Sequence, residues 1–270
     1  MSRAERFRAK YGPWALVTGA ARGLGTEFSR QIAALGLNLV LVDVIADELT
    51  RVAEEVRRNT GRKVKTVVAD LAQPGFIKAV KEGTDGVEIG LLVSNAAFPP
   101  VGLFFEQSLE DKLRMVDVNV RAPLMLVEEF GRRMLDRRRG GIILVSSASA
   151  LQGVPCIASY AATKAYNLIL AESLWDELRW HGVDVLGFMP GTTRTTGFVL
   201  SKPHLERSRL ATVMEPAPTA AEALEALGRT PSHIAGARNR WTIFLAQRLL
   251  PRRRLITLVG NTMRAWYGKD

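Results

Sequence analysis

Six short, almost wholly apolar runs recur along this chain, and longer stretches with helical spacing separate them. Such runs are typical of strands buried on both faces, which occur in parallel sheets covered by helices. Their alternation with helices predicts an α/β fold with a doubly wound parallel sheet of six to seven strands and helices on both faces. The predicted strands are residues 14–18, 39–44, 65–69, 90–94, 141–146 and 183–189.

The stretches between these strands are rich in good helix formers. The predicted helices are residues 26–35, 48–59, 109–138 and 159–180. No linker, repeat or low-complexity segment divides the 270 residues, so residues 1–270 are expected to form a single domain. The alternation fades after about residue 195, and residues 195–218 are expected to form a substrate lid.

Composition excludes several classes of protein. With 47% hydrophobic and 24% charged residues the chain resembles a globular protein, and no apolar run approaches the roughly 20 residues needed to span a bilayer. The net charge of +10 attracts anions, but no nucleic-acid reading element accompanies it, so no nucleic-acid partner is expected. A single cysteine, Cys156, and the lack of a secretion signal favour the cytoplasm.

Residues 239–270 form a basic amphipathic tail. Apolar residues recur there at helical spacing, and three arginines, Arg252 to Arg254, follow Pro251. Such helices dock on the protein's own core or on a twin subunit, or lie on a membrane surface. All three alternatives stay open from the sequence, and membrane association through residues 239–270 would suit an apolar substrate.

A glycine-rich turn, residues 18–25 (Thr-Gly-Ala-Ala-Arg-Gly-Leu-Gly), follows the first predicted strand and leads into a helix. Glycines let the backbone approach a pyrophosphate, while free N–H groups at a helix N-terminus favour negative charge. This placement in the first βα unit indicates a dinucleotide site of the Rossmann type. A tight turn without a ligand is the competing interpretation.

Asp43 ends the second predicted strand, 18 residues after Gly25. A carboxylate at this place accepts hydrogen bonds from the adenosine ribose and repels a 2′-phosphate, which favours NAD over NADP. A capping role for Asp43 is the alternative, and Arg22 offers a 2′-phosphate some compensation.

Tyr160 and Lys164 are spaced to share one face of a helix, one turn apart. A tyrosine has a pKa near 10, so it becomes a useful base at neutral pH only when a positive charge such as that of Lys164 lowers this pKa. Ser147 ends the fifth predicted strand, where ligands bind in such sheets, and Asn119 lies in a helix facing the same region. These four residues, in this order, predict a proton-transfer centre.

Together these motifs resemble the short-chain dehydrogenase/reductase family over about residues 10–197. The resemblance makes Tyr160 the general acid/base, Ser147 the donor that polarises the substrate oxygen, and Lys164 a partner of both the phenol and the ribose. Asn119 would hold a water of the proton relay. The resemblance also implies a homodimer or homotetramer built through residues 109–138 and 159–180.

The cofactor-binding residues implied by the resemblance are Thr18, Gly19, Arg22, Gly23, Leu24, Gly25, Asp43, Asp70, Leu71, Asn95, Ala96, Tyr160, Lys164, Pro190, Gly191, Thr193 and Thr195. Among them Asp70 would lie beside the adenine and Asn95 would stabilise the central sheet. One departure is Ala97, which stands where the family has glycine, and another is Val44, where many NADP-using relatives have arginine. The second departure supports NAD.

An apolar wall is expected around the substrate, including Phe98, Ser149, Leu151, Ile157 and Phe198. Arg194 would meet solvent or an anionic group at the mouth. No metal is expected, since His181, His204 and His233 lack ligand spacing and are interpreted as surface residues.

The sequence therefore predicts an oxidoreductase that transfers a hydride between NAD(H) and a hydrophobic secondary alcohol or ketone of the steroid, long-chain acyl or aromatic class. The alternatives are an NADPH-dependent reductase of 3-oxoacyl thioesters and a non-enzymatic NAD-binding redox sensor.

Overall fold

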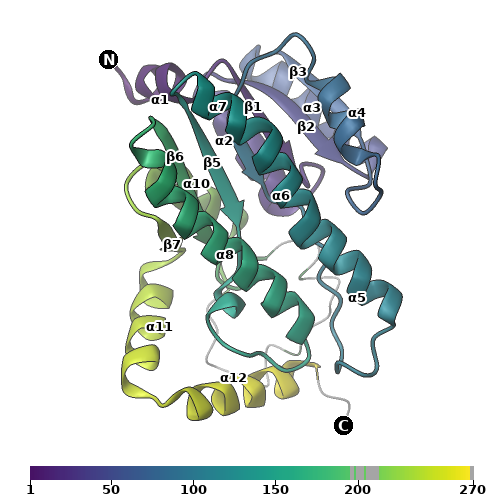
Figure 1. Ribbon diagram of the computed structural model, residues 1–270, viewed down its shortest axis with the longest axis vertical. Coiled ribbons are helices and arrows are strands. Elements are labelled where there is room, and N and C mark those ends of the chain that lie inside the picture. Colours follow the sequence, from purple (N-terminus) through teal and green to yellow (C-terminus); the bar gives the residue numbers. More distant parts are fainter. Residues whose placement is uncertain (195–197, 199–203, 205–212, 268–270) are drawn as a thin grey trace.

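The computed structural model describes residues 1–194, 198, 204 and 213–267, and its centre is one sheet of seven parallel strands (Figure 1). The strand order is β3-β2-β1-β4-β5-β6-β7, the doubly wound arrangement that the alternation predicts. The strands are β1 (Trp14–Thr18), β2 (Asn38–Asp43), β3 (Val64–Val68), β4 (Ile89–Ser94), β5 (Gly140–Val145), β6 (Val183–Met189) and β7 (Ser232–Ile234). The first six agree with the predicted strands to within a residue at each end.

Helices cover both faces of this sheet (Figure 1). Alternate side chains of a strand point to opposite faces, so Ala15 and Val17 of β1 join one core cluster and Leu16 joins the other. One cluster packs against α2, α3 and α10, and the second packs against α4, α6 and α8. The described helices are α1 (Arg3–Tyr11), α2 (Gly23–Ala34), α3 (Ala46–Thr60), α4 (Phe76–Gly83), α5 (Leu109–Val116), α6 (Ala122–Leu126), α7 (Arg132–Asp136), α8 (Ala158–Arg179), α10 (Pro216–Ala226), α11 (Ala237–Leu249) and α12 (Arg252–Tyr267).

The helix predicted over residues 109–138 is interrupted twice by wider π-helical turns, at Asp117–Arg121 and Val127–Gly131. Pro123 explains the first interruption. It has no N–H to donate to the carbonyl of Asn119 four residues earlier, so that carbonyl is left without its usual helical partner.

Two further expectations need correction. The predicted lid, residues 195–218, ends earlier than expected because Pro216 opens α10, and most of the remaining lid lies outside the described residues. His233 is only partly exposed, with 21% of its side chain accessible to solvent. It lies on β7, stacks on Phe188 with ring centres 6.4 Å apart, and its ring bonds Glu222 at 3.1 Å.

The C-terminal tail forms two helices, α11 and α12, with Pro251 at the break. In α12 the side chains of Leu255, Met263 and Trp266 are buried, and the last two join a small core with Val154 and Ala161. Docking on the protein's own core is thus the alternative that α12 adopts. Within the described parts of the chain, no helix has the length and apolar character needed to cross a membrane.

Candidate active site

The glycine turn lies between the end of β1 and the start of α2. Gly19 has a φ of +66° and Gly23 a φ of +57°, values that side chains disfavour. A Cβ atom on Gly19 would lie 2.8 Å from the Cα of Ala96, and one on Gly25 would lie 1.9 Å from the carbonyl oxygen of Gly19. The turn is therefore as tight as its glycines allow. The first turn of α2 contains no acidic residue, and no side chain caps its N–H groups.

Asn95, just after β4, ties this turn to the centre of the sheet. Its side-chain amide donates to the carbonyl oxygens of Thr18 and Gly19, at 2.9 and 3.1 Å. In return the Thr18 hydroxyl accepts the backbone N–H groups of Asn95 and Ala96 at 3.0 and 3.1 Å. Thr18 is fully buried by these contacts, so it supports the turn from behind.

Asp43 lies at the carboxyl end of β2 with both carboxylate oxygens engaged. One accepts the backbone N–H of Ala21 at 2.9 Å and the other that of Ile45 at 3.1 Å. Its neighbour in the turn, Arg22, contacts Glu48 at 3.4 Å. The carboxylate is thus fixed beside the glycine turn, and the arginine is partly neutralised by a second acid.

A cavity of about 800 Å³ connects the glycine turn and Asp43 with the carboxyl ends of β4, β5 and β6. Most residues named from the sequence meet there. The predicted site residues that line it are Gly19, Arg22, Gly23, Leu24, Asp43, Asp70, Leu71, Asn95, Ala96, Phe98, Ser147, Ser149, Ile157, Tyr160, Lys164, Pro190, Gly191, Thr193 and Phe198.

Four predicted site residues do not line the cavity: Thr18, Gly25, Asn119 and Leu151. Thr18 and Gly25 shape the turn from within. Leu151 ends a short 3-10 turn after β5, from which Ala148 and Ser149 face the cavity instead. The remaining predicted residue, Thr195, lies outside the described residues.

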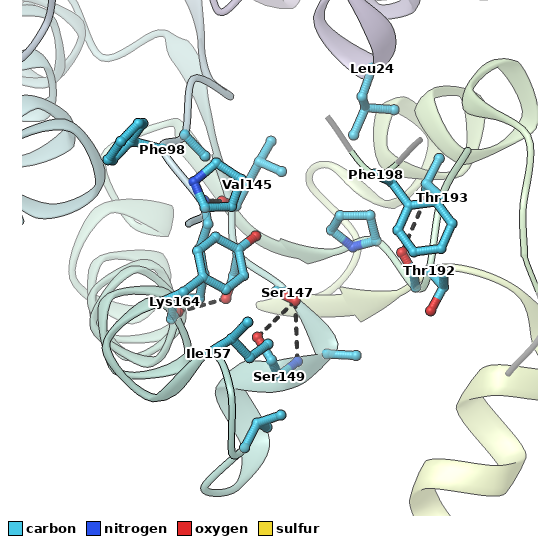
Figure 2. A pocket seen from close by; sticks show the side chains of 18 of the residues that line it. Leu24, Phe98, Val145, Ser147, Ser149, Ile157, Lys164, Thr192, Thr193 and Phe198 are labelled. Atoms are coloured by element: carbon cyan, nitrogen blue, oxygen red, sulfur yellow. Dashed lines mark hydrogen bonds between the residues drawn. The ribbon is translucent and has the colours of Figure 1, made fainter. Parts of the chain in front are cut away.

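Ser147 is held by its neighbour Ser149, as Figure 2 shows. The Ser147 hydroxyl oxygen accepts the backbone N–H of Ser149 at 3.2 Å and the Ser149 hydroxyl at 2.9 Å. These two bonds occupy the lone pairs of Ser147, so its own proton can be donated, either to the Tyr160 hydroxyl or to a substrate oxygen. Ser149 therefore orients the donor, in addition to the predicted place on the substrate wall.

Lys164 and Tyr160 come from the same side of α8, as their spacing predicts. The Lys164 ammonium is buried, donates to the carbonyl oxygen of Val145 at 2.8 Å (Figure 2) and lies 5.7 Å from the centre of the Tyr160 ring. Burial lowers the pKa of Lys164 to about 8. The charge on this lysine is accordingly easier to lose than that of a solvated lysine.

The Tyr160 ring is partly exposed to the cavity, yet loss of water around its hydroxyl raises the pKa of Tyr160 to about 12. A hydrogen bond from Ser147 opposes this rise. The lowering of this pKa that was expected from Lys164 is not among its causes, and burial is the largest of them. Tyr160 holds its proton at neutral pH, which suits it to act as an acid.

Asn119 supports the site from a fully buried position. Its side-chain oxygen accepts the backbone N–H of Phe98 at 2.8 Å, and its amide donates to the Phe98 carbonyl at 3.2 Å and to the Thr163 hydroxyl at 3.1 Å. The amide of Asn167 donates to the Asn119 carbonyl at 3.0 Å, the group that Pro123 leaves without a helical partner. Asn119 thereby joins the cavity wall at Phe98 to α8. Asn167 was not predicted from the sequence, although its place one helical turn after Lys164 puts it on the same side of α8.

The far wall of the cavity is built largely by the C-terminal tail, which the sequence analysis did not connect with the site. The tail residues that line it are Thr242, Ile243, Ala246, Gln247, Leu255, Leu258, Val259, Thr262, Met263, Trp266 and Tyr267. The Trp266 ring packs edge-on to Phe198 at 6.3 Å between centres. Apolar periodicity predicted helices in the tail, but it did not indicate that these helices would cover the cavity.

Two charged residues near the site are paired. Asp70 accepts a hydrogen bond from Arg114 at 3.0 Å at the cavity edge. Arg194 does not line the cavity; its side chain is 56% exposed and bonds Glu215 at 2.9 Å, which agrees with the expected contact with solvent.

A nicotinamide dinucleotide fits this donor set. The glycines of the turn leave space that a Cβ atom would fill, the uncapped N-terminus of α2 supplies N–H groups to phosphates, and Asp43 supplies acceptors for ribose hydroxyls. In the described residues no group of histidine, cysteine and carboxylate side chains is arranged to hold a metal ion.

Comparison with known proteins identifies the family. Residues 13–204 match the short chain dehydrogenase family. The chain is 33% identical to a 7beta-hydroxysteroid dehydrogenase of Collinsella aerofaciens over 236 residues, which cover 87% of this chain and 90% of that protein. This chain belongs to the short-chain dehydrogenase family. It is accordingly an oxidoreductase that acts on CH–OH groups with NAD(P).

Other relatives of this short-chain dehydrogenase show the range of the family. A very-long-chain 3-oxoacyl-CoA reductase-like protein of Arabidopsis thaliana is 35% identical over 181 residues, which cover 65% of this chain and 58% of the longer protein. A solved structure described for 7beta-hydroxysteroid dehydrogenase stereoselectivity has a TM-score of 0.88 at 31% identity, covering 94% of this chain and 98% of that one. A short-chain dehydrogenase from Sphingobium yanoikuyae, solved with NADPH, has a TM-score of 0.77 at 27% identity and covers 88% and 94%.

Proposed function

We propose that this short-chain dehydrogenase transfers a hydride between NAD(H) and a hydrophobic secondary alcohol or its ketone, with Tyr160 as general acid/base. The observation that carries the proposal is the single cavity, because it joins the dinucleotide elements to the hydroxyls of Ser147 and Tyr160 and continues to an apolar wall. The substrate class supported best is a rigid, steroid-sized molecule, which the hydroxysteroid dehydrogenase among the relatives also favours.

The bound nicotinamide supplies or accepts the hydride at its C4 carbon. In the reduction direction Ser147 turns its proton from the Tyr160 hydroxyl to the substrate carbonyl oxygen and donates a hydrogen bond there. Tyr160, protonated at neutral pH, gives its proton to the same oxygen as the alcohol forms. Lys164, between α8 and the end of β5, holds a positive charge near the phenol. This charge favours the phenolate that remains after Tyr160 has given up its proton.

Asn119 enters the proposal as a positioning residue. Its side chain is occupied by Phe98 and Thr163, and its carbonyl by Asn167. The support that these contacts give is mechanical, because they fix both the irregular segment that follows β4 and the helix that carries Tyr160. The role expected from family resemblance, holding a relay water, stays a prediction.

The preference for NAD rests on Asp43. Its carboxylate is fixed at the cavity by two backbone bonds, so it cannot turn away from an added phosphate, and repulsion disfavours NADP. Arg22 offers only a partly neutralised charge, since it contacts Glu48. The family uses both cofactors, and the relative from Sphingobium yanoikuyae is solved with NADPH, so the preference is a property to measure.

We propose a homodimer because α5, α6 and α8 expose apolar side chains. Leu109, Leu113 and Val116 of α5 and Leu124 of α6 point into solvent, with exposures of 69, 56, 45 and 46%. Ile169 of α8 is also exposed, and α5 contacts α8. Pairing of two copies through this face would cover a row of side chains that would otherwise stay in water.

The proposed compartment is the cytoplasm, where the buried thiol of Cys156 stays reduced.

The alternative function is reduction of a 3-oxoacyl thioester with NADPH, which the relative from Arabidopsis thaliana favours. One experiment separates the two. Absorbance of the reduced cofactor is followed with hydroxysteroids, aromatic ketones, 3-oxoacyl thioesters and small polar alcohols, each with NAD(H) and NADP(H). The proposal expects the highest kcat/KM for a hydroxysteroid or aromatic ketone with NAD(H). Turnover confined to thioesters with NADPH would establish the alternative, and turnover of small polar alcohols alone would refute both.

A further inference from the structure

The helix α11 has an outward face that nothing in the described structure covers. No residue of α11 is buried. One side carries Ile243 and Ala246 toward the cavity. Opposite them Trp241, Phe244, Leu245 and Leu249 are exposed by 66, 47, 47 and 72%.

These four residues, here called the outer face of α11, follow helical spacing and form one stripe. Trp241 and Phe244 pack edge-on at 6.1 Å between ring centres, and the Arg248 guanidinium lies 4.9 Å from the centre of Phe244. Figure 1 shows α11 extending away from the sheet beyond β7, with α12 running back beneath α8. The stripe is therefore on a projecting part of the molecule, where a flat surface can reach it.

The charge of this part of the chain is as one-sided as its apolar stripe. Of the 37 basic and 27 acidic residues, 9 basic and 1 acidic lie after Glu225, which leaves 28 and 26 in the rest of the chain. Eight of the ten net positive charges thus reside in the C-terminal sixth of the protein. Between residues 226 and 267 there are eight arginines and no acid.

Most of these arginines have no acidic partner in the part of the chain that the structure describes, unlike those of the helices that cover the sheet. Arg132 and Arg133 pair with Glu128 and Glu129 one turn earlier. By contrast, Arg248 and the three exposed arginines that open α12, Arg252 to Arg254, form no ion pair with any described residue. Positive charge is left available beside the apolar stripe.

We infer that the outer face of α11 and the arginines that open α12 bind an anionic lipid surface. Aromatic and leucine side chains enter the boundary between headgroups and acyl chains, while arginines meet the lipid phosphates. A second copy of the chain is a poorer occupant, because a two-fold pairing of this face would bring two acid-free arginine clusters together. A soluble polyanion would satisfy the arginines but leave the leucines in water. The opposite side of α11 lines the substrate cavity, so an apolar substrate would leave the bilayer next to its binding site.

Co-sedimentation of the full-length protein with vesicles tests this inference without any substrate. The vesicles contain phosphatidylcholine alone or phosphatidylcholine with one quarter phosphatidylglycerol. Wild-type protein is expected to bind the anionic vesicles, and added salt should weaken binding. Replacing Arg252, Arg253 and Arg254 together by Gln should lower the partition coefficient by about 100-fold, since each cation near such a surface contributes roughly five-fold.

The double change Trp241→Ser with Phe244→Ser should abolish binding to the anionic vesicles, because it removes the aromatic part of the stripe. Phe105→Ser is the matched control, since Phe105 is 94% exposed but lies outside the acid-free segment. Circular dichroism and thermal unfolding verify the fold of each variant.

Equal vesicle binding by wild type and the Trp241, Phe244 double variant would overturn the inference. The inference would also be overturned if the only change in the double variant were a smaller oligomer in sedimentation velocity. That result would assign the outer face of α11 to a second copy of the chain. If wild type and the double variant bind heparin equally and neither binds vesicles, the outer face of α11 would be assigned to soluble polyanions.

Discussion

Removal of one oxygen atom, by Tyr160→Phe, is the sharpest test of the proposed chemistry. The ring of Tyr160 keeps its packing in this variant, and the hydrogen bond shared with Ser147 is lost. An ordinary intramolecular hydrogen bond contributes about 1 kcal/mol to stability, so the variant should fold and melt close to wild type.

The loss in rate should be far larger than the loss in stability. A positioned acid or base contributes about 100- to 10,000-fold, equivalent to roughly 3 to 5 kcal/mol of transition-state stabilisation. We therefore expect kcat to fall by at least about 100-fold, while the Kd for NADH, measured by fluorescence titration, changes by less than about threefold.

The pH profile adds a second readout. Because burial raises the pKa of Tyr160 to about 12, the hydroxyl is protonated throughout the range of ordinary assays. Wild-type reduction should not depend on this group between pH 6 and about pH 9, whereas alcohol oxidation, which needs the ionised form, should rise with pH. The residual oxidation by Tyr160→Phe should lose that rise.

Tyr166→Phe is the matched control, because Tyr166 is on the same helix but exposed to solvent. It should retain wild-type kinetics in both directions. Turnover by Tyr160→Phe within about tenfold of wild type would refute the assignment of Tyr160 as the acid/base. A parallel loss in the Tyr166 variant would instead point to damage of α8.

Three further changes test the surroundings of the reaction. Burial lowers the pKa of Lys164 from 10.5 to about 8, so the protonated lysine destabilises the folded state by about 3 kcal/mol below pH 8 and by less as the pH rises toward 10.5. In urea unfolding, the stability of wild type should therefore rise relative to that of Lys164→Met between pH 8 and 10. Parallel curves of stability against pH would contradict this. Asp43→Ala should lower the ratio of kcat/KM for NAD to that for NADP at least about tenfold, and an unchanged ratio would remove Asp43 as the selector. Gly25→Ala places a methyl 1.9 Å from the Gly19 oxygen and should lower stability by about 2 kcal/mol or more and weaken cofactor binding, whereas Gly75→Ala, with nothing within 4 Å of the new methyl, should do neither.

The part of the site that could be predicted depends on short spacings along the chain. Six strands were predicted to within a residue because each is buried on both faces and therefore reads as an apolar run. The seventh, Ser232–Ile234, has three partly exposed residues and leaves no such pattern. The shared face of Tyr160 and Lys164 was predictable because helix geometry alone fixes it.

Positions near a motif proved less certain than the motif itself. Leu151 and Asn119 belong to segments that border the cavity, yet neither side chain lines it. Leu151 is directed by the short turn in which it lies, and Asn119 by the hydrogen bonds of its buried amide. Likewise the pKa of Tyr160 depends on how much water the folded chain excludes, and here burial raises it despite the hydrogen bond from Ser147.

The sequence by itself determined the order of the elements, the glycine turn beside Asp43 and the pairing of Tyr160 with Lys164. These features depend on the periods of strands and helices and on residues close in the chain. Only the tertiary structure decided that α12 closes the substrate cavity with Trp266 while α11 turns its own aromatics outward. An apolar period shows that a helix face must be covered, but which surface covers it depends on contacts between segments far apart in sequence, and those exist only after folding.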